Sequence, residues 1–89
     1  MDDITIAEVS KSKTETLRIR LNEFHGRHFL DVRAFYEKDD GELAPTKKGV
    51  AIPLAKVADV IQALQAGLAK ADELGLLNGE GHERQTITG

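Results

Sequence analysis

Basic and aromatic side chains are interleaved through the middle of the chain. They are Arg18, Arg20, Phe24, Arg27, Arg33, Tyr36, Lys47 and Lys48. Lysine and arginine neutralise phosphates, and an exposed aromatic ring offers an unpaired base a surface on which to stack. Because a duplex hides the faces of its bases, this combination is typical of surfaces that bind single-stranded nucleic acid. Two simpler interpretations stay open, since basic strand faces are often only solvated and the chain's four aromatic rings can all belong to a core.

Two alternating segments that meet at a tight turn carry most of these residues. In residues 16–22 one face is apolar, and the open face holds Arg18, Arg20, Asn22 and, by continuation, Phe24. His25-Gly26 predicts the turn, and residues 27–36 predict a second strand. One face of that strand is apolar, and the other holds Arg27, Phe29, Asp31, Arg33 and Phe35. Apolar residues on both faces predict that one face packs on the domain's own core and the other on something outside.

The remaining elements follow from loop residues and a change of period. Lys38–Gly41 predicts a hairpin loop, after which Leu43–Ile52 forms a third strand whose Pro45 confines its start to a sheet edge or a bulge. Residues 4–9 add a fourth strand. From Leu54 apolar residues recur at helical spacing, which predicts a helix over about residues 53–74. The sequence therefore predicts an α+β domain over residues 1–77, with the sheet at about 4–52 and a disordered tail at 78–89.

Size and charge narrow the classes of protein. A chain of 89 residues without cysteine fits one small domain of marginal stability, for which a partner subunit is a common remedy. The net charge of −3 disfavours a nucleic-acid partner only when the chain is taken as a whole. Residues 11–49 hold nine bases and seven acids, so the positive charge lies where the alternating strands are predicted.

No persuasive catalytic or cofactor set is present, so the sequence predicts a protein that is not an enzyme and needs no cofactor. His25 and His28 alone make a poor metal site, and the glycines form no phosphate-binding loop between a strand and a helix. No apolar run approaches a membrane span, and no charged-then-apolar leader opens the chain. We therefore expect a cytoplasmic protein with no membrane partner, associated with the nucleoid if it is bacterial.

Three short motifs resemble the positive-cofactor-4 family of transcriptional coactivators. The motifs are Phe24-His25-Gly26-Arg27, Asp31-Val32-Arg33-Ala34-Phe35-Tyr36 and Pro45-Thr46-Lys47-Lys48-Gly49. The family pattern reads Phe-Lys-Gly-Lys, then Asp-Ile-Arg-Glu-Tyr-Trp, then Pro-Gly-Arg-Lys-Gly before the helix. The resemblance covers about residues 15–70, with strands and helix in the same order.

The resemblance implies a curved four-stranded antiparallel sheet followed by one long helix, a homodimer, and binding of single-stranded DNA with little sequence specificity. The implied roles form three groups: base stacking by Phe24 and Tyr36; phosphate contacts by Arg27, Arg33, Lys47 and Lys48, beside Arg20 on the same open face; and tight turns with close backbone approach at Gly26 and Gly49. A transcription complex is an implied partner.

Departures from the pattern predict weaker binding and a bacterial or phage-type member. His25 stands in place of a lysine, Tyr36 in place of a tryptophan and Thr46 in place of a glycine. The Ser- and Lys-rich N-terminal region of the eukaryotic members is missing. Strict alternation also puts Arg33 and Tyr36 on opposite faces, so both serve one groove only if the strand bulges or ends near Ala34–Tyr36.

Two alternatives remain at this stage. In the first, the chain is a protein-interaction module whose Phe29 and Phe35 contact a polymerase or regulator. In the second, the strand that it binds is RNA, because stacking grooves tolerate both nucleic acids and nothing in the sequence obviously reads a 2′-hydroxyl.

Overall fold

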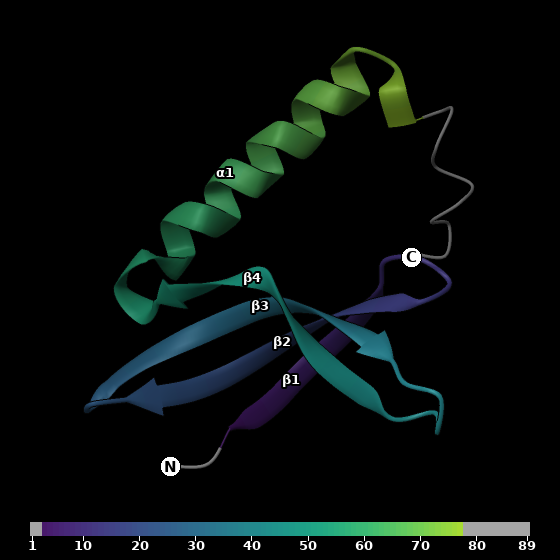
Figure 1. The fold of residues 1–89 in the computed structure, drawn as a ribbon. Helices are drawn as coiled ribbons and strands as arrows, with labels where there is room; N and C mark the ends of the chain where they lie inside the picture. The colour runs from purple at the N-terminus through teal and green to yellow at the C-terminus, as the bar shows by residue number, and fades with distance from the viewer. Residues whose placement is uncertain (1–2, 78–89) are drawn as a thin grey trace. The chain divides into compact units, whose positions relative to one another are not determined.

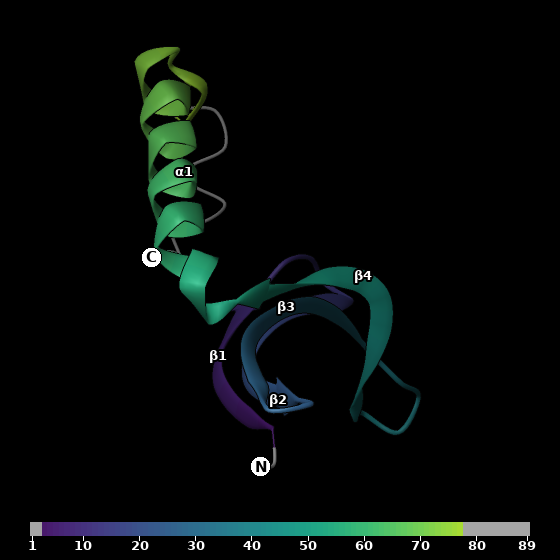
Figure 2. The same ribbon diagram turned by 90° about the vertical axis from the view of Figure 1, so that its left-hand side faces the viewer.

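A four-stranded antiparallel sheet followed by one helix forms the described part of the chain (Figure 1). The computed structural model describes residues 3–77. The strands are β1 (Ile4–Ser10), β2 (Glu15–Phe24), β3 (Arg27–Glu37) and β4 (Leu43–Pro53), and the helix is α1 (Leu54–Glu73). Strands adjacent in sequence are adjacent in the sheet, in the order β1-β2-β3-β4, and Figure 2 shows how strongly the sheet curls. The predicted α+β fold class is confirmed.

The hairpin between β2 and β3 has a two-residue loop, as predicted. His25 and Gly26 have φ angles of 54° and 78°, the left-handed pair that matches the twist of two antiparallel strands. From this loop the pairing of β2 with β3 runs without interruption from Phe24↔Arg27 to Glu15↔Tyr36. This uninterrupted register decides which side chains share a face.

The two faces of the sheet differ in character. We call polar face the side on which β2 and β3 place the residues around Asp31: Thr16, Arg18, Arg20, Asn22, Phe24, Arg27, Phe29, Asp31, Arg33 and Phe35. We call apolar face the opposite side: Leu17, Ile19, Leu21, Leu30, Val32 and Ala34. Among the described residues only Asp31, Ala34 and Phe35 are buried.

One phenylalanine of the polar face, Phe35, is covered by its own chain. Phe35 is 3% exposed, and the guanidinium carbons of Arg18 and Arg20 lie 4.4 and 5.4 Å from its ring centre. Cations stacked on an aromatic face are attracted to its electron density, which explains why two arginines cover a phenylalanine. The prediction that Phe35 contacts an outside polypeptide is therefore wrong, because these arginines already bury it.

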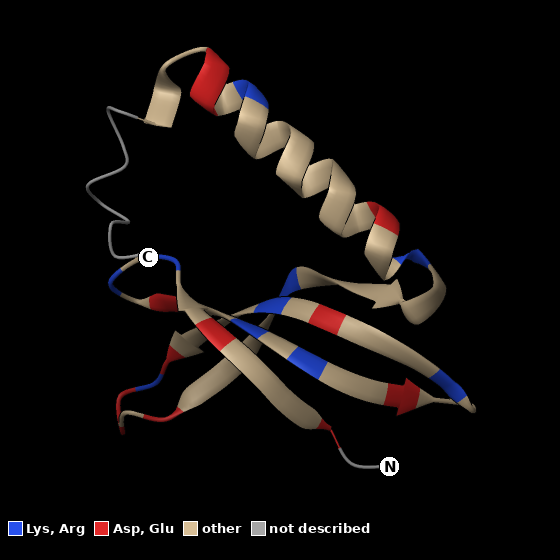
Figure 3. Ribbon diagram, turned by 180° about the vertical axis from the view of Figure 1, so that it is seen from behind, with Lys and Arg blue, Asp and Glu red and all other residues tan. Residues whose placement is uncertain are grey.

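The described residues form two compact units that divide after Val57, and the helix lies mostly in the second of them. It begins one residue later than predicted because Pro53 still pairs with Phe29 in the sheet. Described by itself, α1 has exposed Ile61, Leu64 and Leu68, and Figure 3 shows that its charged residues lie towards its two ends. Within residues 3–77 no helix is long and apolar enough to cross a membrane. The predicted tail, residues 78–89, lies outside the described residues.

Candidate nucleic-acid interface

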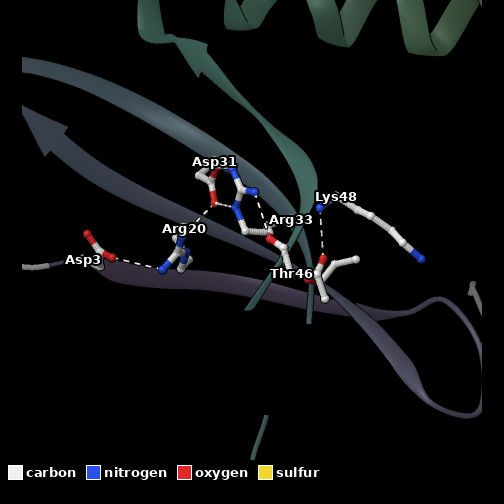
Figure 4. A network of polar contacts seen from close by, with 7 residues as sticks. Asp3, Arg20, Asp31, Arg33, Thr46 and Lys48 are labelled. Atoms are coloured by element: carbon white, nitrogen blue, oxygen red, sulfur yellow. Dashed lines mark hydrogen bonds and ion pairs between the residues drawn. The ribbon is translucent and has the colours of Figure 1, made fainter. Parts of the chain in front are cut away.

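A buried carboxylate, Asp31, lies at the centre of the basic residues on the polar face (Figure 4). Its Oδ2 accepts hydrogen bonds from Arg20 Nη2 at 2.8 Å and Arg33 Nε at 3.1 Å, and its Oδ1 accepts one from Arg33 Nη2 at 2.9 Å. Burial alone would raise the pKa of Asp31, but the hydrogen bonds from Arg33 and Arg20 outweigh it, and the pKa lies below its ordinary value. Asp31 therefore stays charged and fixes two guanidinium groups.

Two acids, Glu8 in β1 and Asp3 just before this strand, pair with the same row of arginines. Arg18 Nε donates to Glu8 Oε2 at 2.7 Å, and Arg20 Nη1 donates to Asp3 Oδ2 at 3.1 Å. The register explains the first pair, because Glu8 lies directly opposite Arg18. The open face of β2 is therefore basic in sequence but largely neutralised in the structure.

A bulge in β4 carries the two lysines of the third motif. Arg33 pairs with Gly49 and Phe35 with Pro45, so the single residue Ala34 faces three residues of β4, Thr46–Lys48. We call these three residues the β4 bulge. The prediction that Pro45 lies at an edge or a bulge is confirmed, since β4 is an edge strand and the bulge begins after Pro45.

Glycine is required where β4 rejoins β3. A Cβ at Gly49 would lie 2.8 Å from Arg33 Cζ and 2.8 Å from the Val32 carbonyl oxygen, both too close for any side chain. Gly49 is therefore needed for its approach to Arg33 and Val32 of the same chain, while its predicted approach to a bound strand stays a prediction. Of the two lysines in the bulge, Lys48 donates from Nζ to Glu15 Oε2 at 3.1 Å, while Lys47 has no ion pair within residues 3–77.

The tip of the β2–β3 hairpin presents the most exposed aromatic side chain of the sheet. Phe24 is 67% exposed and its ring lies edge-on to His25, with ring centres 4.0 Å apart. Across the hairpin Phe24 pairs with Arg27, which has no ion pair in the described part of the chain. A cation without an ion pair and an exposed ring thus lie side by side at this tip, on the turn that Gly26 makes possible.

Tyr36 is separated from this group. It is 44% exposed, and its register with Glu15 and Ala44 places it on the side opposite Arg33. The bulge lies in β4 and β3 itself is regular, so Tyr36 is not turned onto the polar face. The structure therefore brings together Arg20 with Arg33 and Phe24 with Arg27, whereas Tyr36 lies on the other side, where its cross-strand neighbour Glu15 holds Lys48 Nζ at 3.1 Å.

Sequence reasoning missed the acidic partners of the basic residues. Asp3, Glu8 and Glu15 had no assigned role, and Asp31 was only one member of a motif. A signal existed for Asp31, because counting outward from a two-residue turn places it directly opposite Arg20. The described residues contain no group of three His, Cys, Asp or Glu side chains that could hold a metal ion.

The fold and the site define a class: a small open-sheet domain with one C-terminal helix and a surface of cations and exposed rings. Residues 11–63 match the family model described as Transcriptional Coactivator p15 (PC4). The chain belongs to this family.

Relatives of two kinds are similar to this chain. An RNA polymerase II transcriptional coactivator of Drosophila melanogaster is 46% identical over 37 residues, which are 42% of this chain and 33% of that protein. The coactivator KIWI of Arabidopsis thaliana is 35% identical over 51 residues, covering 57% of this chain and 43% of that protein. The chain thus spans less than half of the length of either relative.

Solved structures agree with the fold. A crystal structure of a PC4 homologue from Burkholderia pseudomallei has a TM-score of 0.68 at 40% identity, covering 71% of this chain and 85% of that one. A bacteriophage T5 homologue of the eukaryotic coactivator, implicated in recombination-dependent DNA replication, has a TM-score of 0.63 at 23% identity, covering 96% and 98%. The phage likeness shows the fold alone.

Proposed function

We propose that this chain is a non-enzymatic, homodimeric, transcription-coactivator-like protein that binds single-stranded DNA with little sequence specificity. The observation that supports this function best is made at the hairpin tip. There the exposed ring of Phe24 lies opposite Arg27, a cation with no ion pair within residues 3–77. A ring beside an available cation lets one unpaired nucleotide be held by its base and its phosphate together. If the basic strand face were only solvated, nothing would require an exposed aromatic ring beside the cation.

The phosphate contacts are unequal in this proposal. Arg27 and Lys47 have no ion pair among the described residues, and Lys48 has only an exposed pair with Glu15, of a kind worth about 0–1 kcal/mol. These three residues provide the main phosphate contacts. Arg20 and Arg33 share Asp31 and add to the local field with their remaining N–H groups.

The proposal assigns Phe24 as the principal stacking ring. Tyr36 stacks on a second base only if the strand crosses from the polar face around the sheet. We therefore expect Phe24→Ala to lower affinity more than Tyr36→Ala does. Both changes leave the salt dependence nearly unchanged, because neither removes a phosphate contact.

The first experiment is fluorescence anisotropy of a labelled oligo-dT strand of about 20 nucleotides, titrated at low and moderate salt beside the matched duplex. Three phosphate contacts per protomer predict a slope of log K against log salt of about −2, at roughly −0.7 per phosphate. Arg27→Ala should reduce the magnitude of this slope by about 0.7. Lys56→Ala, on the first turn of α1, is the matched control.

The outcomes separate the candidate functions. Tight, salt-sensitive binding of the single strand with much weaker duplex binding supports the proposal. Equal binding of duplex and single strand would remove the stacking role, and absence of binding at low salt would remove the function. An oligo-rU strand in the same assay tests binding of RNA. If oligo-rU binds more tightly than oligo-dT, RNA and not DNA is the ligand.

A further inference from the structure

Hydrogen bonds that involve side chains hold the β4 bulge in addition to the backbone pairing on either side of it. Thr46 makes three of them: its carbonyl oxygen accepts from Arg33 Nη1 at 3.1 Å, its Oγ1 donates to the Ala34 carbonyl at 2.8 Å, and the same Oγ1 accepts from the Lys48 backbone N–H at 3.1 Å. Residues in a bulge lose their regular ladder partners. Here a hydroxyl and a guanidinium replace those partners.

The guanidinium that holds the Thr46 carbonyl is itself fixed. Arg33 donates through Nε and Nη2 to the two oxygens of Asp31, a fork that determines the plane of the group. Asp31 is buried, with a side chain 3% exposed. Gly49 leaves the space in which Arg33 passes against β4, since a Cβ there would meet Arg33 Cζ at 2.8 Å. Three of the five N–H donors of Arg33 are therefore committed within the protein.

The contacts of Thr46 fix the backbone from which Lys48 extends. Figure 4 shows the Lys48 side chain pointing away from the network while its backbone N–H is tied to Thr46. A lysine carries a flexible stem, so the direction in which its charge is presented depends on the backbone that carries it.

We propose that Thr46 is a positioning residue for single-strand binding: its hydroxyl, together with the Arg33–Asp31 pair, fixes the β4 bulge so that Lys47 and Lys48 meet the phosphates of the bound strand. This inference rests on the proposed function. It assigns Arg33 to the support of the bulge in place of a direct phosphate contact. It also gives a role to a residue at which the family pattern carries glycine.

The test compares Thr46→Val, which removes the hydroxyl at nearly constant volume, with Thr46→Ser, which keeps it. We expect Thr46→Val to weaken oligo-dT binding by about three- to tenfold, the equivalent of one or two hydrogen bonds, and Thr46→Ser to stay within about twofold of wild type. Exchange of the Lys48 amide proton should become faster in Thr46→Val and stay slow in Thr46→Ser. Thr14→Val, in the exposed segment between β1 and β2 and with no side-chain hydrogen bond within residues 3–77, is the matched control.

A double-mutant cycle separates positioning from general stability. If Thr46 acts through the lysines, adding Thr46→Val to a Lys47→Ala, Lys48→Ala background should change affinity by less than about twofold. A merely structural role would lower affinity equally in both backgrounds and in proportion to the loss of Tm. Thr46→Gly, which also lacks the hydroxyl, serves the same cycle where Thr46→Val does not fold.

Each outcome is decisive. If the wild-type chain does not bind oligo-dT, the proposed function and this inference both fall. If wild type binds and Thr46→Val binds equally well, or the loss persists without the lysines, only this inference falls. The inference is supported if Thr46→Val weakens oligo-dT binding only when Lys47 and Lys48 are both present, and if the Lys48 amide proton exchanges faster in this variant.

Discussion

At the scale of single residues, the balance between one buried acid and two arginines determines how the polar face is built. Removing one partner of a buried ion pair is costly because it leaves the other charge desolvated and unpaired. The side chains of Arg20 and Arg33 are 20% and 23% exposed, so water relieves part of that cost. The buried carboxylate of Asp31 is therefore the stability-determining member of the group.

We expect Asp31→Asn to lower the free energy of unfolding by about 3 kcal/mol, at the low end for a broken buried pair. Asparagine keeps the volume and one acceptor oxygen but removes the charge that both arginines share. Urea denaturation at neutral pH measures the change. Asp39→Asn, in the exposed β3–β4 loop, should leave the midpoint unchanged, and an equal loss in both variants would contradict the role of Asp31.

The same carboxylate predicts a dependence of stability on pH. The pKa of Asp31 in the folded protein lies below its ordinary value of 3.8, so its contribution is fully present above that value. As pH falls below about 4 through the folded pKa, the stabilisation is lost because the native carboxylate must be protonated. Glu15, whose pKa is lowered by hydrogen bonds from Lys11 and Lys48, acts in the same direction.

Urea midpoints of wild type and Asp31→Asn between pH 3 and pH 7 test this dependence. The wild-type midpoint should fall more steeply at the acid end, so that the gap between the two curves narrows there. Parallel curves over the whole range would show that Asp31 carries no charge-linked stability.

Part of this arrangement could be read from the sequence and part could not. The exposure of Phe24 and the grouping of Arg20 with Arg33 follow from strict alternation and a two-residue turn. The contacts of Thr46 do not follow, because they depend on how many residues β4 inserts before it pairs again with Arg33. That number is set by tertiary contacts of Gly49 and Arg33 rather than by local pattern.

At the scale of elements, β1 brings an acid, Glu8, against the arginines on the polar face of β2. Residues 4–9 were predicted as a strand from alternation alone, and Glu8 and Asp3 gain a role only once β1 lies antiparallel to β2. These carboxylates occupy the arginine N–H groups that a phosphate would otherwise use. The family match over residues 11–63 does not include β1, so this neutralisation comes from outside the matched segment.

Glu8→Gln should therefore raise affinity for oligo-dT by a factor of about 1.4 to 5, the range of an exposed ion pair of about 0.2–1 kcal/mol. The salt dependence should become steeper, because Arg18 is released to contact phosphate. Anisotropy titrations at three salt concentrations measure both effects. Glu42→Gln, whose partner Lys38 lies in the β3–β4 loop, changes the net charge equally and is the control.

If Glu8→Gln and Glu42→Gln raise affinity by the same factor, the effect is one of net charge, and the pairing of Glu8 with Arg18 has no particular influence on binding.

At the scale of the whole molecule, the chain exposes more apolar surface than a small domain leaves uncovered when it acts alone. Ile4, Val9 and Val50 are exposed on the sheet, and Ile61, Leu64 and Leu68 are exposed along α1 described by itself. Burial of apolar side chains is the main source of folding free energy, and among the described residues only two apolar ones, Ala34 and Phe35, are buried. In the proposed homodimer, a second copy of the chain would cover these side chains.

The exposed apolar surface predicts that the stability of the protein depends on its concentration. Dissociation into monomers costs the apolar burial between copies, so the Tm of wild type should rise as the protein is concentrated. Leu64→Glu places a charge on the exposed apolar side of α1 and should shift the sedimentation equilibrium from dimer towards monomer. Gln62→Glu adds the same charge on another side of the helix and should leave the dimer intact. A wild-type chain that sediments as a monomer at all concentrations would contradict the homodimer. Equal dissociation of both variants would instead show that charge on the helix, and not loss of apolar contact through Leu64, separates the two copies.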